Sequence, residues 1–124
     1  MARQREAKLL LDAGEHWGAY YLTGYAVECA LKACIVKQFP RHTIPDRKLV
    51  NDFYTHEVDR LLSLTTLRKS LLSDPKRELN WTIIKDWSEQ ARYNSDITSS
   101  LAHDLYQACT MRTSGVLPWL HKHW

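Results

Sequence analysis

Residues 19–36 constrain the fold more than any other part of the chain, because as a helix they would be apolar around nearly the whole circumference. A helix of this kind belongs at the centre of a bundle, since no side of it suits solvent. Yet the segment also carries Glu28 and Lys32 one turn apart, on the same face as Tyr25. Buried charges are costly unless they are paired or hydrogen-bonded. The sequence therefore predicts a central helix with a polar seam that other helices must satisfy.

The remaining segments also follow helical spacing. Apolar residues recur three and four positions apart, and an alternation of period two never persists. We expect helices near residues 3–13, 16–38, 55–72, 74–87 and 96–120. The chain is thus predicted to be one all-α domain, residues 1–124, folded as an up-and-down bundle of four or five helices.

Local signals set the expected boundaries of these helices. Pro75 follows Asp74, which fits a cap residue with proline at the first helical position. Thr55 is predicted to cap the next helix after a basic loop over residues 40–54. Pro118 is expected to break or kink the last helix, because it removes the hydrogen bond to Ser114.

Composition narrows the function without identifying it. The net charge of +3 permits an anionic partner and does not demand one. Cys29 and Cys34 are five residues apart, which is neither a metal knuckle nor a redox pair, so we interpret the three cysteines as reduced core residues. His121 and His123 do not complete a metal site, and neither a metal nor another cofactor is predicted. We expect no membrane association and a cytoplasmic location, because the N-terminus is charged and no apolar run reaches 18 residues.

The order of these blocks resembles the HEPN family of helical domains (higher eukaryotes and prokaryotes nucleotide-binding). The resemblance begins at residues 7–14 and is most specific in Gly-Tyr-Ala-Val-Glu-x-x-Leu-Lys, residues 24–32. It resumes at residues 55–62 and 87–93 and closes in the amphipathic last helix. The resemblance implies a bundle that pairs with a second copy of itself. It also implies membership of a group that includes RNA-cleaving toxins and non-catalytic partners of small nucleotidyltransferases.

The chain departs from the family at the motif that cleaves RNA. Ribonucleases of the family use an Arg followed, after four to six residues, by a His in the last helical segment. Here Arg92 and His103 are separated by ten residues, and Arg112 and His121 by eight. The departure argues against RNA cleavage.

Several polar residues remain candidates for a site, each with a structural alternative. Glu28 either forms an ion pair with Lys32 that fixes the packing, or orients His56 or Arg92. His56 either bonds to backbone or to a carboxylate at a helix start, or transfers protons or contacts phosphate. Arg92, beside Tyr93, either grips a phosphate or pairs with a carboxylate.

Two functions follow from these observations. The favoured one is a non-catalytic or divergent HEPN protein in a toxin–antitoxin-like setting. It would form a homodimer and bind a partner protein, such as a nucleotidyltransferase, or a nucleotide or RNA, through a polar cluster of Tyr25, Glu28, Lys32, His56, Arg92 and Tyr93. The alternative is a metal-independent endoribonuclease toxin with a rearranged site, whose catalytic residues would be Arg92 and His103.

Overall fold

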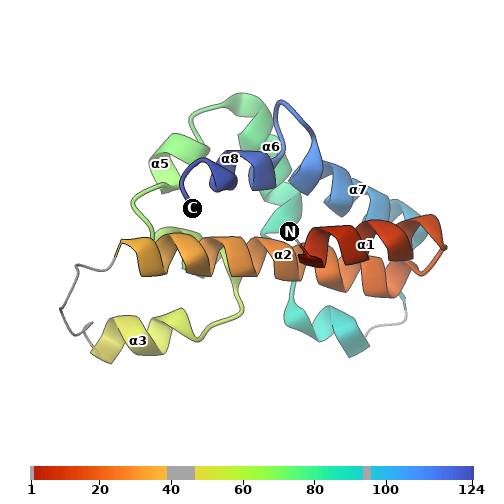
Figure 1. The fold of residues 1–124 in the computed structure, drawn as a ribbon, viewed down its shortest axis with the longest axis horizontal. Helices are drawn as coiled ribbons and strands as arrows, with labels where there is room; N and C mark the ends of the chain where they lie inside the picture. Colours follow the sequence, from red (N-terminus) through yellow and green to blue (C-terminus); the bar gives the residue numbers. More distant parts are fainter. Residues whose placement is uncertain (1, 39–46, 94–95) are drawn as a thin grey trace.

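The computed structural model describes residues 2–38, 47–93 and 96–124, and every element within them is helical (Figure 1). In chain order the elements are α1 (Ala2–Asp12), α2 (His16–Lys37), α3 (Arg47–Phe53), α4 (Val58–Ser63), α5 (Arg68–Leu71), α6 (Pro75–Ile84), the 3-10 helix η1 (Glu89–Tyr93), α7 (Ser99–Thr110) and α8 (Val116–His121). The predicted all-α class is confirmed for these residues. The described ranges hold eight α-helices, more than the four or five predicted. The segments predicted at 55–72 and 96–120 each divide into two helices, and α3 forms within the predicted loop.

Helix α2 is the centre of the molecule. Helices α1 and α7 pack against it, as do α4, α8 and η1, so it has neighbours on several sides. Figure 1 shows α8 on one side of α2 and the pair α3 and η1 on the other. The small residues Ala19, Ala26 and Ala30 have no exposed surface and let these neighbours approach closely. The apolar circumference of residues 19–36 thus produces the predicted central helix.

Gly24 and Trp87 make the closest approach between α2 and the segment before η1. A Cβ atom on Gly24 would overlap the indole ring of Trp87, which is buried. The Trp17 indole, near the start of α2, donates a hydrogen bond to the Ala91 carbonyl of η1. Two tryptophans therefore fasten η1 to the central helix.

Several predicted boundaries are confirmed. Helix α1 ends before Gly14, whose φ of +81° reverses the chain into α2 in a conformation that glycine adopts most easily. Asp74 caps α6 by accepting a hydrogen bond from the Arg77 backbone N–H, with Pro75 at the first helical position.

Other boundaries were predicted wrongly. Residues 47–53 of the expected loop form α3, in which Val50 and Phe53 are half-buried at helical spacing. Arg41 and His42 of the same basic loop lie outside the described residues. Thr55 does not cap α4: its hydroxyl accepts from the Glu57 N–H in a local turn, and α4 begins at Val58.

Pro118 does not break the last helix. It is the third residue of α8, where a missing N–H costs little because the first four N–H groups have no intrahelical acceptor. The break lies earlier, between Thr110 and Gly115. The Ser114 carbonyl accepts a hydrogen bond of 2.8 Å from the Asn80 side chain instead, which joins this turn to α6.

No helix in the described part of the chain is long and apolar enough to cross a membrane.

Candidate functional site

The polar seam predicted on α2 is present, and its centre is Glu28. This side chain is only 2% exposed although it is a carboxylate. Its Oε2 lies 3.5 Å from the Lys32 Nζ, and its Oε1 lies 2.8 Å from the His56 Nδ1. One neighbour comes from α2 and the other from the segment between α3 and α4, so both oxygens of the carboxylate are engaged. Pairing of this kind offsets the cost of burying the charge.

His56 joins the seam to η1. Its second ring nitrogen, Nε2, lies 3.3 Å from the Glu89 Oε2. A neutral imidazole donates from one nitrogen only, so both contacts are hydrogen bonds only when the ring carries two protons. The His56 side chain is 45% exposed, whereas the Glu28 side chain beneath it is buried. The histidine therefore sits at the surface between two carboxylates from different elements.

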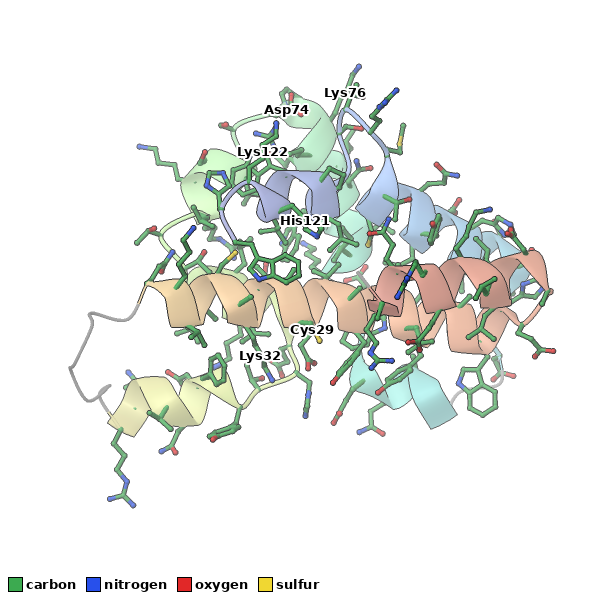
Figure 2. All side chains as sticks on the ribbon, viewed as in Figure 1. Cys29, Lys32, Asp74, Lys76, His121 and Lys122 are labelled. Carbon is green, nitrogen blue, oxygen red and sulfur yellow. The ribbon has the colours of Figure 1, made fainter. Side chains whose placement is uncertain are left out.

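Aromatic rings lie near Lys32 and Glu28 on this side of α2. Figure 2 shows Lys32 and Cys29 on the side of α2 that faces α3 and η1. The Lys32 ammonium lies 5.5 Å from the centre of the Phe53 ring in α3. Tyr25 stacks on Tyr21, with 6.0 Å between ring centres. Lys32 is therefore shared between the Glu28 carboxylate and an aromatic face.

Tyr25 and Cys29 are coupled to each other and are not activated nucleophiles. The neighbouring Cys29 raises the pKa of Tyr25 through its charge and a side-chain hydrogen bond, and burial and Glu28 add to the effect. Burial raises the pKa of the Cys29 thiol above its usual value, despite the opposing hydrogen bond from Tyr25. A thiol with a raised pKa is protonated near neutral pH and reacts slowly.

A surface pocket of about 330 Å³ lies beside His56. Its walls are formed by Thr55, His56, Glu57, Trp87, Ser88, Glu89 and Gln90. Among the side chains that the structure describes, these walls carry two carboxylates and neither lysine nor arginine. Such a lining suits cationic groups or hydrogen-bond donors, and it repels phosphate.

The other predicted site residues are not brought to this pocket by any described contact. Arg92 and Tyr93 belong to η1, but their side chains lie outside the described part of the structure. His103 is exposed on α7, where its Nδ1 lies 2.8 Å from the Ser99 carbonyl oxygen and its ring centre 6.3 Å from that of His16. His16 begins α2, twelve residues before Glu28, which corresponds to about 18 Å along the helix axis. His103 therefore lies beside the first residue of α2, whereas the Glu28 seam lies near the middle of that helix.

Sequence analysis did not single out Glu89, which completes the contacts of His56. Glu89 lies in a 3-10 helix of five residues, and no periodic pattern in the sequence indicates how such a short element is oriented. Trp87, two residues earlier and buried against Gly24, was the available signal that this segment packs on α2.

Among the described residues, no group of three histidine, cysteine, aspartate or glutamate side chains could hold a metal ion. His121 packs against Trp124 and His123 against Trp119, with ring centres 4.7 and 4.3 Å apart.

Comparisons with protein-family models, with curated proteins and with solved structures found no match to the chain.

Proposed function

We propose that this chain is a HEPN-type helical domain that acts by binding a partner protein and does not cleave RNA. The observation that carries the proposal is the acidic pocket beside His56, whose described walls include Glu57 and Glu89 and, apart from the histidine itself, no basic side chain. RNA and nucleotides present phosphates, which this lining repels, whereas a protein partner can offer lysine, arginine or backbone N–H groups.

The seam beneath the pocket supports the same function. Glu28 is already engaged by Lys32 and His56, so its carboxylate is not available to a substrate. His103, a predicted catalytic residue of the alternative ribonuclease, lies beside His16, about 18 Å along the helix axis from Glu28. Neither observation favours a site that combines these groups.

The ribonuclease alternative is tested with purified protein and total RNA. Wild type, Arg92→Ala and His103→Ala are incubated with RNA in parallel, and we expect the RNA to remain equally intact in all three. Cleavage by wild type that either substitution abolishes would overturn the proposal.

The binding function is tested by reconstitution. Affinity purification from the native source identifies candidate partners, and a nucleotidyltransferase-type protein is the partner that the HEPN resemblance suggests. A stoichiometric complex rebuilt from the two purified proteins is the expected result. Saturable binding of a short RNA or a nucleotide, with no such protein complex, would contradict it.

A further inference from the structure

Helices α6 and α7 leave a groove that the Glu28 seam and its pocket do not use. We propose that this groove docks an amphipathic helix of the partner protein, with aliphatic side chains on its inner face and lysine or arginine beside them. The inference rests on the proposed function and specifies the chemistry of the partner.

The apolar part of the groove is a pocket of about 260 Å³ between the two helices. Ile83 of α6 and Leu101 of α7 form its walls and are 42% and 48% exposed, with Tyr20 of α2 beside them. Leu79 is 67% exposed and lies one turn before Ile83, on the same face of α6. These side chains form an apolar strip rather than isolated exposed residues, and such a strip is typical of a binding surface.

The charged part of the groove is acidic. Asp86 and Asp104 line the same pocket, and neither forms an ion pair with any residue that the structure describes. Burial raises the pKa of Tyr20, and the negative charge of the nearby Asp86 carboxylate raises it further. The charge of Asp86 therefore affects a side chain that lines the groove.

A second pocket extends the groove toward η1. It has a volume of about 220 Å³ and shares Tyr20 and Asp86 with the first. The described side chains that line the two pockets include no lysine or arginine, in a chain whose net charge is +3. The groove is therefore locally opposite in charge to the molecule as a whole.

This combination selects among occupants. An amphipathic helix laid in a groove uses aliphatic anchors about one turn apart, which matches the spacing of Leu79 and Ile83. Flanking cations on that helix would meet Asp86 and Asp104. A second copy placed symmetrically on the groove would instead bring the same two carboxylates against each other, which is unfavourable. Charge thus favours a basic helix over a symmetric pair of this chain.

A designed peptide tests the proposal without knowledge of the partner. The probe is a fluorescein-labelled helix with leucines at every third and fourth position and lysines beside them. The comparison peptide has glutamate in place of every lysine. Fluorescence anisotropy against the full chain should give saturable binding for the lysine peptide, weakened by salt, and none for the glutamate peptide.

Variants locate the binding. The pairs Asp86→Asn with Asp104→Asn, and Ile83→Ser with Leu101→Ser, should each weaken binding by about tenfold or more. The matched controls are Glu6→Gln and Leu9→Ser on α1, which remove an exposed carboxylate and a 69% exposed leucine, and these should change affinity less than about twofold. Circular dichroism verifies that each variant is folded.

Each other outcome overturns the groove proposal. Absence of saturable binding, or equal losses in the control and groove variants, rejects a specific docking site. If the groove variants instead abolish self-association seen by light scattering, the occupant is a second copy. None of these results affects the RNA assay, so failure of the groove is distinguishable from failure of the proposed function.

Discussion

At the scale of single residues, Glu28 shows how an interior charge is tolerated. The carboxylate is held by Lys32 from its own helix and by His56 from another segment. The apolar circumference of the helix around Glu28 was sufficient to predict its burial, independently of the resemblance to HEPN domains.

We predict that Glu28→Ala lowers the free energy of unfolding by about 1–3 kcal/mol, because the substitution leaves its partners without an acceptor. Urea denaturation of the two proteins measures the difference. Glu28→Gln is the matched control, since the amide oxygen can still accept from His56, and it should lose less. An unchanged midpoint for Glu28→Ala would show that the seam contributes nothing to stability.

We expect substitution of Gly24 by alanine to affect stability in the direction opposite to that usual for a glycine inside a helix. Replacing an interior helical glycine by alanine ordinarily stabilises a protein by up to about 1 kcal/mol. Here the added methyl group would overlap the Trp87 indole, so we expect Gly24→Ala to destabilise by about 1–3 kcal/mol.

Gly18→Ala on the same helix is the control for Gly24→Ala. Its Cβ would meet only the end of the Leu10 side chain, at 3.0 Å, and that side chain can move. Thermal unfolding should place Gly18→Ala near or above wild type and Gly24→Ala well below it. Equal melting temperatures for the two variants would refute the close packing of Trp87.

At the scale of elements, short helices are joined by polar side chains. Asp59 of α4 accepts hydrogen bonds from the Trp81 indole of α6, at 2.8 Å, and from the Arg68 guanidinium of α5, at 3.1 Å. Burial pushes the pKa of Asp59 upward, but these two donors outweigh it and leave the pKa below the usual 3.8. One carboxylate thus connects three elements.

The sign of the pH dependence follows from that lowered pKa. Asp59 stabilises the folded state above pH 3.8, and its contribution is lost as the pH falls through the folded-state value. Trp81→Phe removes one donor, so the pKa of Asp59 should rise and acid unfolding should begin at a higher pH. Unfolding followed by circular dichroism from pH 6 to pH 2 tests this. In an Asp59→Asn background, Trp81→Phe should no longer change the pH at which acid unfolding begins.

Element boundaries were predictable where a side chain makes a cap and not where tertiary contacts decide. Asp74 with Pro75, and Gly14, could be recognised from local chemistry alone. Helix α3 could not be predicted, because its charged residues are typical of a loop. Its position depends on the contacts of Phe53 with Lys32 and with the hydrophobic core. The effect of Pro118 was predicted wrongly, because it depends on the position of the proline within its helix. The Asn80–Ser114 hydrogen bond helps to set where α8 begins, and therefore that position.

At the scale of the whole molecule, the sequence predicted a helical class and a central helix, and those are the features fixed by hydrophobic periodicity. The sequence also predicted that Glu28, Lys32 and His56 belong to one polar cluster, and these three side chains are in contact. It could not predict the groove between α6 and α7, because Ile83 and Leu101 each look like core residues when their own helix is considered alone. Which apolar residues stay exposed is decided only by the packing of both helices.

Self-association remains a prediction at this scale. The HEPN resemblance implies a homodimer, and the like charges of Asp86 and Asp104 favour an interface elsewhere than between α6 and α7. Multi-angle light scattering at high micromolar concentration should give twice the mass of 14.5 kDa for wild type. The pair Asp86→Asn with Asp104→Asn should leave that mass unchanged. A strict monomer would contradict the homodimer.

The fastening of η1 by Trp17 and His56 has a spectroscopic consequence. Trp17→Phe and His56→Gln remove the hydrogen bond to Ala91 and weaken the contact with Glu89. In that double variant η1 can move away from α2 and expose the Trp87 indole to water, whereas the residue is 3% exposed in the structure. The tryptophan emission of the protein, to which Trp81, Trp119 and Trp124 also contribute, would then shift to longer wavelength, and a larger part of it would be quenched by iodide. Trp87 therefore gives the intrinsic fluorescence one component that depends on whether this short helix is docked.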